Sequence, residues 1–171
     1  MDERLKYAIF PVRWGYFGLL STEKALLRTS LPAPSAAAVK VHLLRGINQA
    51  EADSKMSLQL QLRISAYFQG SCVDFSNIRL DLSHLTPFAR GVLLACRKIK
   101  YGHTATYSRL AQMSRSPHAA RAVGNILAKN PLPLIIPCHR IIRADGQLGG
   151  FSAPQGTKLK QKLINLEKKS R

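Results

Sequence analysis

The sequence predicts an α/β (α+β) protein in which a small N-terminal α/β domain, residues 1–82, precedes a mostly helical C-terminal domain, residues 83–171. Short apolar and aromatic runs typical of strands occur in the first part. Segments with helix-start signals occur in the second. The charge balance also changes at this boundary. Residues 1–82 hold 10 Lys and Arg against 7 Asp and Glu, whereas residues 83–171 hold 16 against 2.

The N-terminal domain reads as a small sheet with two helices and carries no recognisable chemistry. Its predicted elements are, in order, strands at 5–10, 14–20 and 24–29, a loop at 31–35, helices at 36–49 and 57–68, and a closing strand at 73–82. The domain contains neither paired catalytic carboxylates nor a phosphate-binding loop. We therefore expect it to support the other domain.

The C-terminal domain begins with clear helix signals. Thr86 is a predicted N-cap with Pro87 at the first helical position, and this helix is expected to reach about Ile99. After a turn at 101–103, Thr106 is expected to start a short helix over 107–113. A further helix is predicted from about 117 to 129, so that the last two form a helix-turn-helix candidate.

Small side chains dominate the second helix of this candidate pair. Ala119, Ala120, Ala122, Gly124 and Ala128 leave a surface that a nucleic-acid groove can approach closely. Arg121 is the one long polar side chain that extends from this surface. The alternative is that the small residues pack against another helix while Arg121 points into solvent.

The net charge of +17 indicates a polyanionic partner for the C-terminal domain. Double-stranded DNA is the leading candidate. An anionic membrane surface and a solvated basic face without a partner are the alternatives. The domain shows no basic amphipathic helix with bulky apolar anchors, so we expect no membrane binding.

Cysteine and histidine usage predicts a reduced compartment and no cofactor. Three cysteines are an odd number, and their spacing fits neither a disulfide framework nor a zinc site. Cys72 and Cys96 are interpreted as inert core residues. Residues 1–4 do not resemble the start of a targeting signal, and no run is long enough to span a bilayer. We expect a cytoplasmic protein without a metal.

Residues 130–142 form the most unusual segment of the chain. Three prolines interrupt an apolar run, which predicts a rigid and largely buried stretch. The segment presents Cys138, followed by His139 and the fixed cation Arg140. A nearby cation or proton acceptor favours the nucleophilic thiolate. On an extended chain Cys138 and His139 would point to opposite faces, so either the chain turns here or a water relays the proton.

Pro137-Cys138-His139-Arg140-Ile141 resembles the active-site motif of the O6-alkylguanine-DNA alkyltransferases, the methylated-DNA–protein-cysteine methyltransferases. The resemblance covers about residues 86–167. Its other motifs are Thr106-Tyr107, Ala120-Arg121-Ala122-Val123-Gly124, Asn130-Pro131-x-Pro133, Gly149-Gly150-Phe151-Ser152 and Lys160-x-x-Leu163-Ile164-x-x-Glu167. Two departures are Lys100, where a proline is common, and Phe151, where a tyrosine is frequent.

The resemblance implies a direct-reversal DNA repair protein whose alkyl acceptor is Cys138. It implies that His139, oriented by Glu167, takes the thiol proton through water, and that Tyr107 donates toward the purine ring. Asn130 is expected to hold the turn that leads to the cysteine. The alkyl group comes from O6 of guanine, with O4 of thymine as a further possible donor.

The resemblance also implies how DNA is bound. Arg121 would fill the space left by a flipped base, and Tyr107, Gly124 and Ser116 would complete the DNA contacts. The expected pocket for the flipped guanine consists of Pro133, Ile141, Phe151 and Ser152.

A thioether on an sp³ carbon has no good leaving group, so we expect the protein to react once, as a suicide enzyme. We expect it to work as a monomer in a prokaryotic cytosol or nucleoid. The competing interpretations are a non-catalytic binder of alkylated DNA and a helix-turn-helix regulator. A regulator would not explain residues 137–140.

Overall fold

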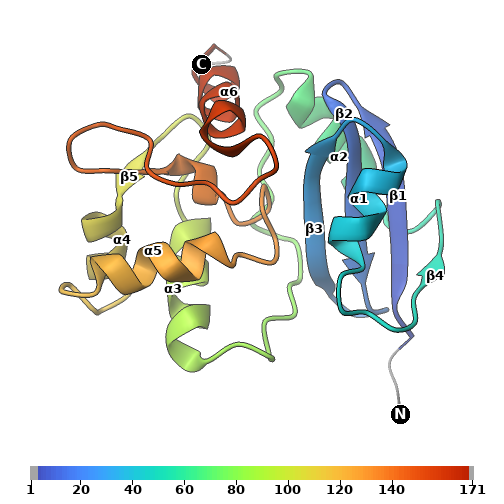
Figure 1. The fold of residues 1–171 in the computed structure, drawn as a ribbon, viewed down its shortest axis with the longest axis horizontal. Helices are drawn as coiled ribbons and strands as arrows, with labels where there is room; N and C mark the ends of the chain where they lie inside the picture. The colour runs from blue at the N-terminus through green and yellow to red at the C-terminus, as the bar shows by residue number, and fades with distance from the viewer. Residues whose placement is uncertain (1–3, 170–171) are drawn as a thin grey trace. The chain divides into compact units, whose positions relative to one another are not determined.

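The computed structural model describes residues 4–169, and the chain divides into two compact units, Met1–Asp81 and Leu82–Arg171 (Figure 1). Met1, Asp2 and Glu3, which contributed to the expectation of no targeting signal, lie outside the described residues. Unit 1 combines a sheet with two helices, and unit 2 is mainly helical, so the predicted α/β fold class is confirmed. Within residues 4–169 no helix is both long and apolar enough to cross a membrane.

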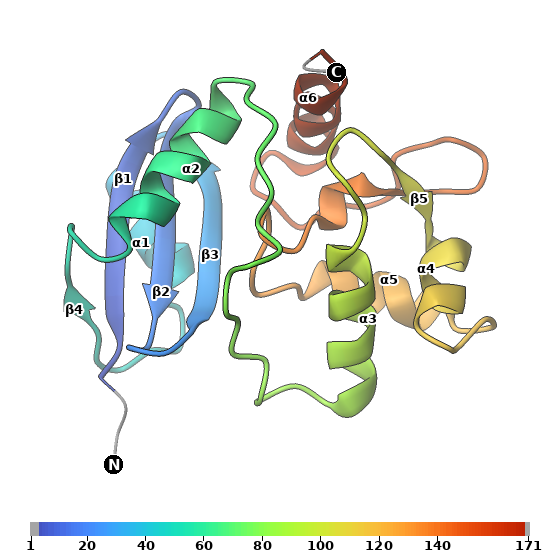
Figure 2. The same cartoon turned by 180° about the vertical axis from the view of Figure 1, so that it is seen from behind.

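Unit 1 is built on a four-stranded sheet with the order β3-β2-β1-β4. Strand β2 (Gly15–Ser21) pairs antiparallel with both β1 (Lys6–Val12) and β3 (Leu26–Ala33). The short strand β4 (Glu51–Ala52) pairs with β1 in parallel. Helices α1 (Ala36–Leu43) and α2 (Leu58–Phe68) cover opposite faces of this sheet, as Figures 1 and 2 show from the two sides.

Successive residues of β2 pack against different helices, as the alternation of a strand requires. The ring of Phe17 lies 5.9 Å from the ring of Phe68 on α2. A Cβ on the next residue, Gly18, would lie 2.6 Å from a methyl group of Val39 on α1. Glycine at this position therefore allows α1 to approach the sheet closely.

Three sequence-based expectations for unit 1 were wrong. Strand β3 continues through residues 31–33, which were predicted as loop, because Pro32 lies on an edge strand where a missing N–H is tolerated. Helix α1 ends at Leu43, well short of residue 49, and Gly46 follows with a φ of +74°. Residues 73–82 form only one bridge, between Leu80 and Leu26, in place of a closing strand.

Unit 2 contains the helix-turn-helix expected from the sequence. Helix α3 (Pro87–Arg97) is capped by the Thr86 hydroxyl, and α4 (Tyr107–Met113) by the Thr106 hydroxyl. Helix α5 packs against both. It spans Ala120–Ala128 and begins two to three residues later than predicted, since residues 116–119 form a turn.

The rest of unit 2 places the Cys138 segment against the C-terminal helix. Strand β5 (Ala105–Thr106) pairs in parallel with β6 (Ile141–Ile142), directly after the 3-10 helix Cys138–Arg140. Helix α6 (Gly156–Lys169) packs against this 3-10 helix. The buried side chains of α6 are Leu159, Lys160, Leu163, Ile164 and Glu167. Their spacing puts Lys160 and Glu167 on one face of the helix.

Candidate active site

Residues 130–137 connect α5 to the 3-10 helix and are fixed by local hydrogen bonds. The Asn130 side chain accepts from the Leu132 N–H at 3.0 Å and donates to the Ile136 carbonyl at 2.9 Å. The Ile136 N–H in turn donates to the Leu132 carbonyl at 2.8 Å. Leu134 has a φ of +77°, an arrangement that strains a non-glycine residue by about 1–3 kcal/mol. Most of residues 131–137 are buried, as predicted.

The chain turns at Cys138, where the 3-10 helix Cys138–Arg140 begins. Cys138 is 7% exposed, and burial raises the pKa of its thiol. A hydrogen bond from the Asn130 side chain, the positive charge of Lys160 and the backbone N–H groups of Cys138 and His139 act in the opposite direction. The sulfur is thus a thiol at rest, beside groups that stabilise the thiolate once it forms.

Glu167 is a buried carboxylate, 2% exposed, that accepts hydrogen bonds from three residues. His139 Nε2 lies 2.7 Å from Oε1, Arg140 Nε lies 2.9 Å from Oε2, and the Gly102 N–H donates to Oε2 at 3.0 Å. Burial opposes ionisation of Glu167, but the hydrogen bonds and charges of His139 and Arg140 outweigh it and hold its pKa well below the usual range. Glu167 is therefore an anion that orients both partners.

Burial also determines the protonation state of His139. Desolvation lowers the pKa of His139 and the charges of Arg140 and Lys160 add to this, which together outweigh the hydrogen bond and charge of Glu167 that raise it. The ring is therefore neutral at neutral pH. When Nε2 carries the proton that faces Glu167, Nδ1 holds a lone pair. The imidazole can thus accept a proton without first losing one.

Arg140 does not serve as the cation that the sequence analysis assigned to the thiolate. Its guanidinium binds Glu167, donates to the Ile99 carbonyl and lies 5.7 Å from the centre of the Tyr101 ring. These contacts explain why an arginine follows the Cys-His pair, since a planar guanidinium suits a carboxylate and an aromatic face at once.

Lys160 supplies that charge instead, although it was not among the predicted site residues. Its side chain is 1% exposed, with Nζ 3.4 Å from the Gly150 carbonyl and 5.8 Å from the centre of the Tyr107 ring. Burial lowers the pKa of Lys160 to about 8, while the charges of Cys138 and Cys96 act to raise it. A perturbed lysine of this kind is typical of functional sites.

The Tyr107 ring lies between two glycines. A Cβ on Gly149 would lie 2.8 Å from the Tyr107 hydroxyl, and Gly149 has a φ of +71°. A Cβ on Gly124 would lie 3.7 Å from the ring, at ordinary contact distance. Burial raises the pKa of Tyr107, so the hydroxyl keeps its proton and can donate it. Gly124 therefore faces Tyr107, in agreement with a packing role for at least this small residue.

The remaining predicted site residues lie on the surface or in the segments before and after Cys138. Arg121 is exposed on the first turn of α5, and Ser116 is half-buried in the turn before it. Ile141 is buried directly after the 3-10 helix, and Pro133 is half-buried. In the loop before α6, Phe151 is half-buried and Ser152 is exposed. Their proposed contacts with DNA or a base stay predictions.

The other two cysteines differ from each other. Cys96 is buried on α3, as expected, and burial followed by the neighbouring Cys138 raises its pKa well above the usual value. Cys72 was expected in the core but is exposed, because it lies in the irregular segment after α2. Among residues 4–169 no three His, Cys, Asp or Glu side chains are grouped closely enough to hold a metal ion.

The chain is similar to proteins of one named family over most of its length. Residues 87–169 match the family model described as the 6-O-methylguanine DNA methyltransferase, DNA binding domain. A methylated-DNA–protein-cysteine methyltransferase of Methanothermobacter thermautotrophicus is 36% identical over 73% of this chain and 70% of that protein. A Haemophilus influenzae protein of the same name is 41% identical over 64% of this chain, which spans only 60% of that relative.

Two further comparisons concern DNA. A DNA base-flipping protein of Thermus thermophilus is 38% identical over 64% of this chain and 73% of that protein. The crystal structure of Mycobacterium tuberculosis OGT in complex with DNA matches 96% of this chain and 94% of that chain, with a TM-score of 0.81 and 30% identity.

Proposed function

Because the chain belongs to the family of methylated-DNA–protein-cysteine methyltransferases, we propose that it repairs DNA by transferring an alkyl group from O6 of guanine to the sulfur of Cys138. The observation that carries this proposal is a buried cluster, in which Cys138 is followed by a neutral His139 and His139 is hydrogen-bonded to an ionised Glu167. This arrangement can remove the proton of a thiol that burial otherwise keeps protonated.

The reaction is an in-line displacement at the alkyl carbon. His139 Nδ1 takes the thiol proton through a water molecule, and Glu167 stabilises the imidazolium that results. The thiolate attacks the alkyl carbon, the S–C bond forms, and the C–O6 bond breaks with its electron pair going to the purine. Tyr107 donates toward ring N3, which disperses the charge that develops on the leaving base. The purine finally takes up the proton removed from the thiol, so guanine and S-alkylcysteine are the products.

The damaged base reaches Cys138 only if it leaves the duplex, at a cost of a few kcal/mol. We propose that Arg121 occupies the vacated space, since it is exposed at the start of α5. The basic balance of unit 2 supports double-stranded DNA as the substrate. The flipped guanine would contact Pro133, Ile141, Phe151 and Ser152, with O4-alkylthymine as a second substrate.

Lys160 adds a stabilising charge to the same site. Its ammonium lowers the pKa of Cys138 and donates to the Gly150 carbonyl, next to the loop that would hold the base. We assign it a positioning and electrostatic role. This role is absent from the sequence-based set of catalytic residues, which consists of Cys138, His139, Glu167, Tyr107 and Asn130.

A reactive free thiol needs a reducing compartment, which supports a prokaryotic cytosol or nucleoid as the place of action. The protein is proposed to act as a monomer, since all residues of the proposed reaction come from one chain. The molecular mass of the free protein in solution tests the monomer. A stable dimer that binds one DNA duplex per pair would contradict it.

A comparison of binding with transfer tests the proposed function. Wild-type protein and the Cys138→Ser variant are each incubated with a duplex that contains O6-methylguanine, and complex formation and intact protein mass are both measured. We expect both proteins to bind and only the wild type to gain a methyl group. Binding by both proteins without any mass change would instead support a non-catalytic reader of alkylated DNA.

A further inference from the structure

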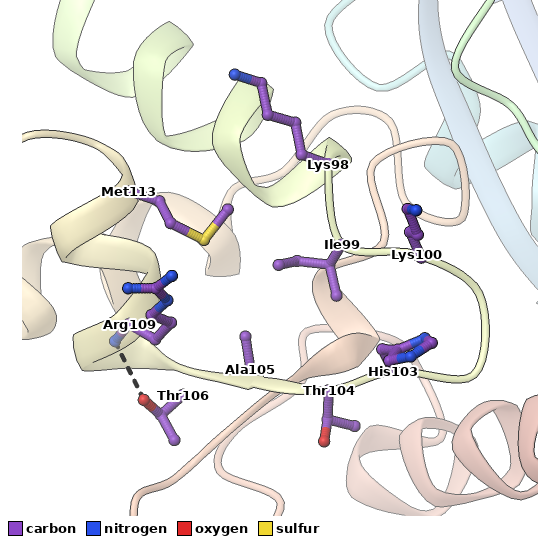
Figure 3. A pocket seen from close by; sticks show the side chains of 9 residues that line it. All are labelled: Lys98, Ile99, Lys100, His103, Thr104, Ala105, Thr106, Arg109 and Met113. Carbon is purple, nitrogen blue, oxygen red and sulfur yellow. Dashed lines mark hydrogen bonds between the residues drawn. The ribbon is translucent and has the colours of Figure 1, made fainter.

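A pocket of about 560 Å³ lies on unit 2, and none of the residues assigned above to alkyl transfer lines it. It is formed by the end of α3, the turn that follows, β5 and one side of α4 (Figure 3). The apolar side chains of Ile99, Ala105 and Met113 face its middle, and Arg109 and His103 lie on two opposite sides. Lys98 and Lys100 complete the charged part of the lining.

Lys98, Lys100 and Arg109 have no carboxylate partner among residues 82–169. The only acidic residues of the described range 82–169 are Asp145 and Glu167. Asp145 pairs with Arg143 at 3.1 Å, and Glu167 is buried against the residues of the proposed active site. Lys98, Lys100 and Arg109 therefore carry positive charge that nothing in the described part of this unit neutralises. Such a group attracts an anion.

The pocket faces away from the side of α4 that carries Tyr107. Each residue advances an α-helix by about 100°, so Arg109 lies about 200° and Met113 about 240° around the helix from Tyr107. Tyr107 faces Gly124 of α5 and Gly149 of the loop before α6. A ligand on Arg109 and Met113 would thus leave the proposed alkyl-transfer site accessible.

We propose that this pocket is a second anion site of unit 2, which takes a phosphate ester of the nucleotide class. The phosphate would contact Arg109 on one side of the pocket, and the positive charges of Lys98 and Lys100 would add to the attraction. The sugar would rest on the apolar middle of the pocket, where Ile99, Ala105 and Met113 offer no competing polar group. Neither the proposed transfer reaction nor the contacts of Arg121 use these residues.

The phosphate ester has two possible sources. One is the backbone of duplex DNA beyond the part held by α5, and this source rests on the proposed function. The other is a free nucleotide, which would bind whether or not the protein repairs DNA. The shared chemistry is a phosphate next to a sugar, and the experiment separates the two sources by probe.

The test follows the backbone amide NMR signals of Thr104, Ala105 and Thr106 during titration with adenosine monophosphate and, separately, with an unmodified duplex. The proteins are wild type, Lys100→Gln/Arg109→Gln, and the matched control Lys158→Gln/Lys168→Gln, which removes the same charge from exposed positions of α6. We expect saturable shifts that the pocket variant loses and the control keeps. With duplex DNA the pocket variant should also lower the magnitude of the log–log salt slope by about 1–2.

A response to the mononucleotide identifies a free nucleotide as the ligand, and a response to the duplex alone identifies the DNA backbone. Absence of saturable shifts with both probes, or equal losses in the pocket and control variants, would overturn the proposal. Methyl transfer to Cys138 from the free alkylated base is measured in each variant. If transfer continues while the pocket signals never respond, the pocket proposal fails and the proposed function stands.

Discussion

Replacing Lys160 with methionine should stabilise the folded protein, because the lysine is charged in a place that disfavours charge. Its side chain is 1% exposed, its one hydrogen bond is 3.4 Å long, and burial lowers its pKa from 10.5 to about 8. At 1.36 kcal/mol for each tenfold change, this difference corresponds to about 3 kcal/mol. Methionine also loses the hydrogen bond to Gly150 and the contact of the ammonium with the Tyr107 ring, which reduces the expected gain to about 1–3 kcal/mol at neutral pH. Methionine fills a similar volume without a charge.

The stability difference between wild type and Lys160→Met should depend on pH. The pKa of Lys160 is lower in the folded than in the unfolded state, so the unfolded state binds more protons between about pH 8 and 10.5. Wild-type stability should therefore rise relative to Lys160→Met across this window and approach it at the upper end. Urea unfolding of both proteins at several pH values measures the difference. A variant that is less stable at neutral pH, with no change across the window, would refute the argument.

The same substitution should slow alkyl transfer. The ammonium of Lys160 lowers the pKa of Cys138, so its loss makes the thiolate harder to form. We expect about a tenfold slower reaction for each 1.4 kcal/mol of thiolate stabilisation removed. The rate with the free alkylated base should recover more steeply with rising pH than that of wild type. Lys158→Met, on an exposed position of α6, is the matched control. An unchanged rate and pH profile in Lys160→Met would remove Lys160 from the mechanism.

Three further predictions concern DNA and the loop before α6. Arg121→Ala should slow repair of duplex DNA strongly and leave the reaction with the free alkylated base near the wild-type rate, since no stack must then be held open. Equal fractional losses in the two rate measurements would contradict a role in base flipping. The log–log slope of duplex affinity against salt should be about −4 to −5, for roughly 4–6 neutralised phosphates, and a flat salt titration would point to another partner. Gly149→Ala should slow alkyl transfer from both substrates and lower the melting temperature, because the new Cβ would lie 2.8 Å from the Tyr107 hydroxyl at a φ of +71°. Gly150→Ala, whose Cβ would meet no atom within 4 Å, is its control. Equal effects of the two alanines would contradict the steric explanation.

Elements with a local start signal could be predicted from the sequence. Thr86 and Thr106 are N-caps whose hydroxyls accept the expected backbone hydrogen bonds, so α3 and α4 begin where predicted. Strand β3 was harder, because Pro32 reads as a loop signal unless its position on a sheet edge is known. The strand predicted at 73–82 was wrong, since a loose alternation of apolar and polar residues carries no information about a pairing partner.

The proposed site could be anticipated only where residues belong to a motif. Cys138 and His139 are adjacent in sequence, and the resemblance added Glu167, which the structure brings to 2.7 Å from His139. Lys160 was missed because a lysine on a basic surface helix is ordinarily solvated. A signal was present, however, in its position seven residues before Glu167, on the face that also carries Leu163 and Ile164. The Lys160 contacts with Gly150 and the Tyr107 ring depend on tertiary structure and have no sequence signal.

The most direct test of the account is where, and how many times, the protein is alkylated. Wild-type protein is incubated with an excess of duplex DNA that contains O6-methylguanine, and its intact mass and cysteine peptides are then measured. Exposed Cys72 and buried Cys96 serve as internal controls, because simple accessibility would favour Cys72. We predict one methyl group per protein, on Cys138, with no further turnover. Methylation of Cys72 or Cys96, or more than one repaired base per protein, would contradict the proposed transfer.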